Sequence, residues 1–321
     1  MIIFHEVHLI VLLLNNNLCS LCLFVAKKSF TTGSIIFLSL ILCACASGEA
    51  AVPERIVCLA PSLDETLIEL GLQARIVGVT SASEYLKEVQ RVERVGSYVK
   101  PNIEKIIALK PDIVLAAGFT GQQPAIKKLS AVGMQVVVID DKQGIEEIFA
   151  RTKQIGEILR VPERSEALLG RMRAVIQETR RRATGLPRPR VYVEAGRDPL
   201  FTCGKGSFIH DLIEIAGGQN IAGEINQPFP RVSSEFILSK DPEVIILPYM
   251  GRNFGKETLK QRKGWEEISA VKTGRIYDDI GVHVITIPSP RLILFGLPET
   301  LKMIHPEIMG EGDKSEKNNQ G

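Results

Sequence analysis

The sequence predicts an α/β fold made of two similar lobes with mostly parallel sheets, bridged by one long interlobe helix. Short apolar strands alternate with amphipathic helices on both sides of residues 143–184. That rhythm is typical of βαβ units and a parallel sheet. Residues 143–184 have an almost unbroken helical periodicity, and motifs from the first half of the chain recur in the second. Together these observations predict a ligand cleft between the lobes.

The amino-terminal lobe is expected over residues 54–142. Helices should begin near Leu63, Asn102 and Gln122. Asn102 is a good N-cap because its side chain can accept a hydrogen bond from the first helical turn, and Glu104 complements the helix dipole there. The strands are expected at Arg55–Ala60, Ile76–Val79, Ile113–Ala117 and Gln135–Ile139.

The interlobe helix is expected over residues 143–184. Apolar side chains recur at helical spacing before and after Val161 and Pro162. Pro162 should kink or restart the helix, because proline lacks a backbone donor.

The carboxy-terminal lobe is expected over residues 185–308, and the polar tail 309–321 is expected to be disordered. The predicted strands are Arg190–Ala195, Val244–Leu247 and Arg275–Asp278. The predicted helices are Ser207–Ala216, Ser233–Ser239, Lys256–Ile268 and Ser289–Met303.

Two motifs recur in the two halves. The stretch from Glu104 to Pro111, followed by an acidic residue and an apolar strand, aligns with the stretch from Glu235 to Pro242. The motif 65–71 likewise resembles the motif 211–217. This internal repeat is the reason for expecting two lobes of similar design.

Residues 1–45 are interpreted as a signal and lipoprotein leader, and residues 46–53 as a tether. A basic pair, an apolar stretch and a small residue precede Cys45 in the order of a secretory signal. Cys45 would then carry a lipid and begin the mature protein, outside the cytoplasm. The alternatives are a plain signal peptide cleaved near Ala46 or Ala51, or an uncleaved anchor. A translation start at Val25 would leave out residues 1–24.

The composition argues against two other classes of protein. A formal net charge of +2 gives no electrostatic case for nucleic-acid binding. The sequence lacks the G-x-S-x-G, H-E-x-x-H and G-x-G-x-x-G motifs, so no enzyme is predicted and no cofactor is expected. Cys203 is the only candidate nucleophile, because Cys58 is expected to be buried in a strand.

Residues 53–305 resemble the periplasmic binding proteins of iron-siderophore, haem and cobalamin uptake systems, and most of all the cobalamin-binding branch. The resemblance lies in the order and spacing of several short motifs. These motifs are Arg55–Thr66, Val77–Thr80, Val95–Ser97, Asn102–Asp112, Phe201–Lys205, Gly217–Asn220 and Ser289–Arg291.

The resemblance implies a monomeric solute-binding lipoprotein that hands its ligand to the permease and ATPase of an ABC importer. It implies one permease-docking carboxylate in each lobe, at Glu104 and Glu235. The alternative is that both side chains only complement helix dipoles. The ligand contacts that it implies are Tyr85, Tyr98, Phe119, Phe201, Lys205, Phe229, His283 and Arg291.

Several alternatives remain open at this stage. The cobalamin branch favours Trp at positions where this chain has Tyr98 and Phe229, so haem or a ferric siderophore is the alternative ligand. His283 is either an axial ligand to a metal centre or a loop histidine without that role. Arg291 either pairs with a ligand anion or caps the lobe. A ligand sensor or structural lipoprotein without a transport role is the alternative of another class.

Overall fold

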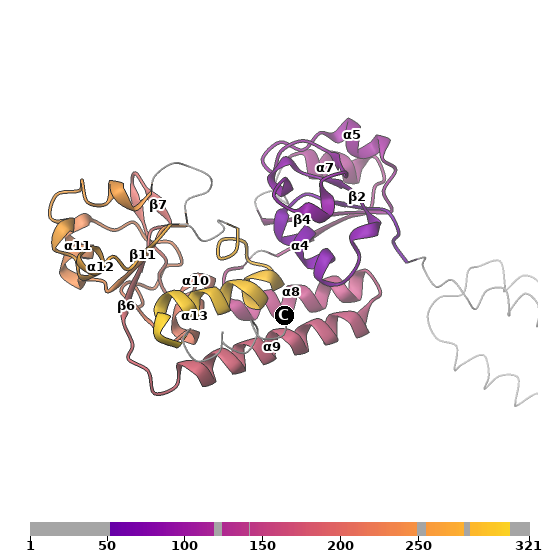
Figure 1. Ribbon diagram of the computed structural model, residues 1–321. Helices are drawn as coiled ribbons and strands as arrows, with labels where there is room; N and C mark the ends of the chain where they lie inside the picture. The colour runs from indigo at the N-terminus through magenta and orange to yellow at the C-terminus, as the bar shows by residue number, and fades with distance from the viewer. Residues whose placement is uncertain (1–51, 119–123, 141, 249–254, 279–282, 309–321) are drawn as a thin grey trace, which may run out of the picture. The chain divides into compact units, whose positions relative to one another are not determined.

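The protein contains two parallel β-sheets with helices packed around them, as the alternating pattern of the sequence predicts (Figure 1). We describe it from a computed structural model. The leader, most of the tether, Phe119 and the tail lie outside the described part of the chain. The structure describes residues 52–118, 124–140, 142–248, 255–278 and 283–308.

The amino-terminal sheet has five parallel strands in the order β3-β2-β1-β4-β5. Its central strands are buried on both faces, so they consist almost entirely of apolar residues. Its helices are α4 (Pro61–Glu69), α5 (Ile103–Ala108) and α7 (Pro124–Ala131). Its strands are β1 (Ile56–Cys58), β2 (Ile76–Val79), β3 (Glu93–Arg94), β4 (Ile113–Ala117) and β5 (Val136–Ile139).

The carboxy-terminal sheet has four parallel strands in the order β11-β10-β6-β9. An antiparallel hairpin of β7 (Gly196–Arg197) and β8 (Leu200–Phe201) follows its first strand. The four strands are β6 (Arg190–Val193), β9 (Gln219–Asn220), β10 (Val244–Ile246) and β11 (Ile276–Tyr277). The helices are α10 (Phe208–Ile215), α11 (Ser234–Lys240), α12 (Ser269–Thr273), the π-helix η6 (Leu292–Gly296) and α13 (Leu297–Ile304).

The two sheets share one topology. In the amino-terminal sheet, β1 lies between β2 and β4, and β4 follows the short helix α5. In the carboxy-terminal sheet, β6 lies between β9 and β10, and β10 follows the short helix α11. Both of these helices end at a non-glycine residue in the left-handed region directly before proline, Lys110 at φ 46° and Asp241 at φ 42°. The predicted internal repeat is therefore present in the backbone.

The acidic residue after each of these prolines explains part of the repeat. Asp112 accepts a hydrogen bond from the backbone N–H of Arg55 at 2.8 Å. Glu243 accepts one from the N–H of Arg190 at 2.9 Å. Both arginine side chains also donate to a carbonyl group at the carboxy-terminal end of the short helix of their lobe. Arg55 donates to Leu109 O at 2.7 Å, and Arg190 donates to Asp241 O at 2.8 Å. Each helix is thus fastened to the start of the first strand of its sheet.

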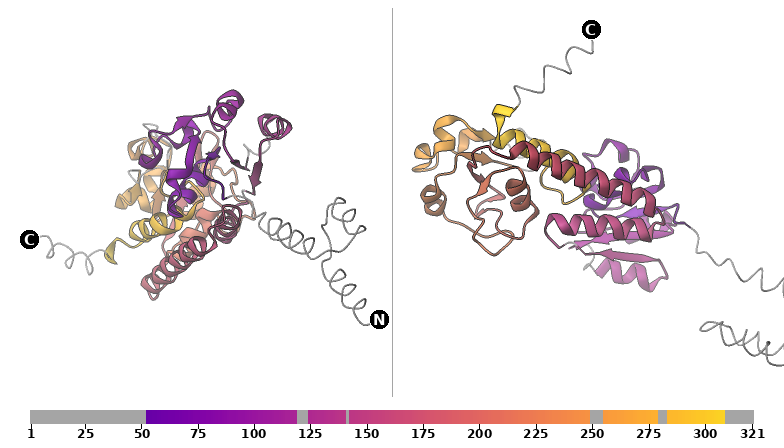
Figure 2. Two further views of the ribbon diagram at one scale, coloured as in Figure 1. Left: turned by 90° about the vertical axis from the view of Figure 1, so that its right-hand side faces the viewer. Right: turned by 90° about the horizontal axis from the view of Figure 1, so that it is seen from below.

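The predicted restart at Pro162 is present, and it divides residues 143–184 into a pair of helices where one long helix was expected. Helix α8 spans Ile145–Ile158 and α9 spans Pro162–Ala183. The chain reverses at Arg160, whose φ of 56° is not helical, and Pro162 then starts the second helix. The two helices pack against each other (Figures 1 and 2).

A second correction concerns residues 256–268. The predicted helix is replaced by two short 3₁₀ turns, η4 (Lys256–Thr258) and η5 (Trp265–Glu267). Gly264 has a φ of 82° between them, which no helix accommodates. The other short 3₁₀ turns are η1 (Gln73–Arg75), η2 (Ser81–Ser83), η3 (Lys87–Val89) and η7 (Pro306–Ile308).

Candidate functional site

A cavity of about 400 Å³ brings together three of the predicted ligand contacts, Tyr85, His283 and Arg291. Tyr85 follows the second strand of the amino-terminal sheet, whereas the other two residues come after the last strand of the carboxy-terminal sheet. We call it the Tyr–His cavity. Its remaining lining residues are Glu65, Leu86, Lys87, Glu88, Val284 and Phe295.

The rings of Tyr85 and His283 form one wall of this cavity. Their centroids are 3.5 Å apart and their planes differ by 11°, so the rings are stacked. Burial lowers the pKa of His283 below its usual range, which keeps the imidazole neutral near pH 7. The stacked imidazole covers one face of the Tyr85 ring.

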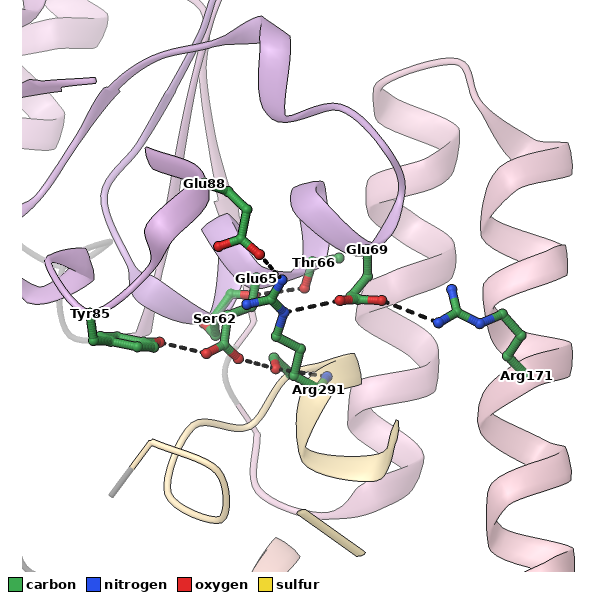
Figure 3. A network of polar contacts seen from close by, with 9 residues as sticks. Ser62, Glu65, Thr66, Glu69, Tyr85, Glu88, Arg171 and Arg291 are labelled. Atoms are coloured by element: carbon green, nitrogen blue, oxygen red, sulfur yellow. Dashed lines mark hydrogen bonds and ion pairs between the residues drawn. The ribbon is translucent and has the colours of Figure 1, made fainter. Parts of the chain in front are cut away.

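The Tyr85 hydroxyl donates to the Glu65 carboxylate at 2.6 Å, and Ser289 donates to the other oxygen of the same carboxylate (Figure 3). Glu65 lies on α4 and is only 3% exposed. Burial raises its pKa to about 7, although the hydrogen bonds from Ser289 and Tyr85 act in the opposite direction. Sequence reasoning placed Glu65 in a repeat and in a family motif, and it missed the part of Glu65 in the cavity. Its neighbours on the helix face are Ser62, Ile68 and Glu69, so the pattern did not mark it as buried.

Arg291 is held by two carboxylates of the amino-terminal half. Its guanidinium donates to Glu69 at 3.0 Å and to Glu88 at 2.6 Å. Glu69 also pairs with Arg171 of α9 at 3.4 Å, which extends the network to the interlobe helices (Figure 3). Arg291 therefore links the Tyr–His cavity to α4 and to the turn at Glu88.

A second cavity of about 290 Å³ gathers the predicted contacts Phe201 and Phe229. We call it the Phe cavity. Phe208 packs edge-on against Phe229, with centroids 6.2 Å apart. The cavity lies where β6 and β10 end, the position at which parallel sheets usually bind ligands. The other lining residues are Ala195, Ile209, Pro248 and Thr286.

The two cavities share one short segment of chain. His283 and Val284 line the Tyr–His cavity, and Thr286 lines the Phe cavity. A single ligand that follows this segment could therefore contact the aromatic residues of both. Tyr98 and Lys205 line neither cavity: Tyr98 packs half-buried against the core, and Lys205 is exposed.

Glu104 and Glu235 are exposed in the first turns of α5 and α11, at equivalent places in the two lobes. Asn102 caps the first of these helices by accepting from the N–H of Lys105 at 3.0 Å. Ser233 caps the second, and its hydroxyl also lowers the pKa of Glu235. Both carboxylates are therefore accessible to a partner.

The cysteines of the described part of the chain are buried, which weighs against a nucleophilic role. Burial raises the pKa of both the Cys58 and the Cys203 thiol, and thiols without appreciable thiolate are poor nucleophiles. Within the described ranges no group of three or more metal-ligating side chains is found. None of the helices described is long and apolar enough to cross a membrane.

Comparisons with known proteins agree with this architecture. The chain is 31% identical to the ABC transporter substrate-binding lipoprotein YvrC of Bacillus subtilis (strain 168), over 81% of this chain and 82% of the relative. It is 30% identical to the vitamin B12-binding protein of Salmonella choleraesuis (strain SC-B67), over 75% of this chain and 86% of the relative.

Among solved structures, the periplasmic vitamin B12 binding protein BtuF of Vibrio cholerae is 25% identical, with a TM-score of 0.62. That similarity covers 79% of this chain and 98% of the Vibrio chain. The family model for periplasmic binding proteins matches residues 56–280. The chain belongs to the periplasmic binding protein family, whose members are the non-catalytic, extracytoplasmic solute-binding components of ABC transporters.

Proposed function

We propose that this protein binds cobalamin or a related corrinoid and delivers it to the permease of an ABC importer. The observation that carries the proposal is the pair of aromatic cavities joined by residues 283–286. A corrinoid is flat and partly apolar and has polar side chains at its rim. It would suit aromatic walls with a few polar anchors. The similarity to proteins described as vitamin B12-binding supports the same ligand class.

Haem or a ferric siderophore is the second candidate ligand. The side chain of His283 supports it, because a neutral imidazole is the form that ligates iron or cobalt. An axial bond from this histidine would alter the visible spectrum of a haem or a corrinoid.

Glu104 and Glu235 are proposed to dock into basic pockets of the permease, one from each lobe. Their exposure and their equivalent positions support this role. Attachment of the protein to the membrane is proposed to occur through a lipid on Cys45, as in its lipoprotein relative. The mass of the amino-terminal peptide of the mature protein tests the anchor, and an unmodified Cys45 there would contradict it.

Calorimetric titration with cyanocobalamin, cobinamide, haem and a panel of ferric siderophores tests the ligand. We expect one-to-one binding of a corrinoid, with a weaker signal or none for haem and siderophores. Tight binding of haem alone would contradict the corrinoid proposal and favour the second candidate. Replacing Phe201 with Ala should weaken corrinoid binding, whereas Tyr98→Ala, outside both cavities, serves as the control.

A further inference from the structure

The segment of residues 283–291 contacts the amino-terminal half of the molecule although it follows the last strand of the carboxy-terminal sheet. Three of its side chains make contacts there. His283 stacks on Tyr85, and Ser289 donates to Glu65. Arg291 pairs with Glu69 and Glu88 (Figure 3). We refer to residues 283–291 as the return segment.

Glu65 joins Tyr85 to the return segment. One carboxylate oxygen accepts from Tyr85, and the other accepts from Ser289 of the return segment. The hydroxyl of Ser289 also accepts from the N–H of Arg291 at 3.1 Å, so the carboxylate begins a short chain of hydrogen bonds. A carboxylate that is 3% exposed has few alternative partners, since water reaches it poorly.

The stack of Tyr85 and His283 depends on the same carboxylate from both ends. The bond to the hydroxyl sets the direction of the Tyr85 ring. The hydrogen bond from Ser289 holds the return segment, which includes His283, close to the Tyr85 ring. Because the two rings come from opposite ends of the chain, no local backbone constraint keeps them parallel at 3.5 Å.

We propose that Glu65 is a positioning residue for the ligand site: it holds Tyr85 and the return segment together and so builds the stacked wall of the Tyr–His cavity. This inference rests on the proposed function, because it assumes that the cavity receives the ligand. Glu65 acts through Tyr85 and His283, and its effect on affinity follows from the wall that they form.

Two measurements on the full mature chain test the inference. The first follows the carbon-bound imidazole protons of His283 by NMR, since stacking on Tyr85 displaces them from their positions in an unstacked ring. His210 and His305 are internal references, because neither lines this cavity. The second is the affinity for cyanocobalamin by calorimetry.

Glu65→Ala should move the His283 signals to unstacked values and weaken cyanocobalamin binding about tenfold to hundredfold, because it leaves two buried hydroxyl groups without their partner. Glu65→Gln should leave the His283 signals at their stacked positions and the affinity for cyanocobalamin within about threefold of the unmodified protein. The reason is that an amide can accept from Tyr85 and donate to Ser289. Glu84→Ala is the matched control, an exposed acid beside Tyr85 that should change neither readout.

His283 signals that stay in place in Glu65→Ala would overturn the inference. If that variant loses the dispersed signals of His210 and His305, it has unfolded, and Ser289→Ala decides instead. This smaller change should shift the His283 signals part of the way, and no shift would overturn the inference. If the unmodified protein binds no corrinoid, the proposed function fails, but the NMR readout still decides whether Glu65 builds the wall.

Discussion

Asp64 and Glu65 are neighbouring carboxyl groups, and both are buried. Asp64 accepts a hydrogen bond from Ser83 at 2.5 Å through one oxygen, while the other oxygen has no partner among the described residues. Burial raises the pKa of Asp64 to about 8, against an ordinary value of 3.8. Between these values the folded protein binds more protons than the unfolded chain. The contribution of Asp64 to stability is therefore present at low pH and is lost as the pH rises toward 8.

We expect Asp64→Asn to reduce the decrease in the free energy of unfolding between pH 5 and pH 8. In the unmodified protein the free energy of unfolding should fall between pH 5 and pH 8, with Asp64 contributing at most about 1.4 kcal/mol per pH unit. The amide does not titrate, so the variant should gain stability relative to the unmodified protein across that interval. Urea unfolding at several pH values measures it, with Glu84→Gln as an exposed control. Equal slopes in the two proteins would contradict the assignment.

Single residues were predicted unevenly from the sequence. Tyr85, His283 and Arg291 were named as ligand contacts, and the structure brings them to one cavity. Their partners Glu65 and Ser289 could not be paired in advance, because they are 224 positions apart in the chain. Residue type indicated which side chains could form a site, whereas their pairing depends on how the return segment folds back.

At the scale of elements, the crossing of α8 and α9 depends on one glycine. A Cβ at Gly156 would lie 2.4 Å from the Cβ of Ser165, a distance that such atoms do not adopt. The absent side chain lets the two helices approach closely. Gly170 on the exposed face of α9 has no atom within 4 Å of the corresponding position, so a side chain there meets open space.

Gly156→Ala should destabilise the protein by about 1–3 kcal/mol, because the helices must separate to admit the methyl group. Gly170→Ala should be neutral or stabilise by up to about 1 kcal/mol, since alanine is the better helix former. Thermal unfolding of the two variants compares the same chemical change at a packed and an open position. Similar melting temperatures would mean that α8 and α9 do not approach as closely as described.

The elements that the sequence predicted best are those with the clearest period. Strands such as 113–117 and 76–79 were placed at their observed limits, because short buried apolar runs have few alternatives. The break was indicated by Val161 and Pro162, which interrupt the helical periodicity, but the apolar pattern resumes after them and suggested one kinked or restarted helix. Residues 256–268 combined helix-forming composition with Gly264, whose left-handed conformation decided against a helix.

For the whole molecule, the equivalent positions of Glu104 and Glu235 lead to a test of transport. The double variant Glu104→Arg with Glu235→Arg should abolish uptake, because the two proposed attractive contacts with the permease would become repulsive. Its affinity for the ligand should stay the same, since neither residue lines the cavities. Uptake of labelled cobalamin by cells and calorimetry on the purified protein measure the two effects separately.

The control for this test is a second double Glu→Arg variant, which changes the net charge of the protein by the same amount. Glu146→Arg with Glu163→Arg also reverses two exposed acids in the first turns of helices, so it reproduces the loss of favourable helix-dipole interactions. Uptake should persist in this control. Uptake that is equally reduced in both double variants would argue against specific docking at Glu104 and Glu235.

The return segment also limits how the halves of the molecule can rotate. The chain passes from the first sheet to the second through α8 and α9, and residues 283–291 bring it back to Glu65, Glu69 and Glu88. A body attached at one point can swivel about any axis. A body attached at two separate points turns freely only about the line through them. Ligand exchange should therefore require rotation of the lobes about a single axis. A permease that acts on one lobe would open the protein only if its force is directed along that rotation.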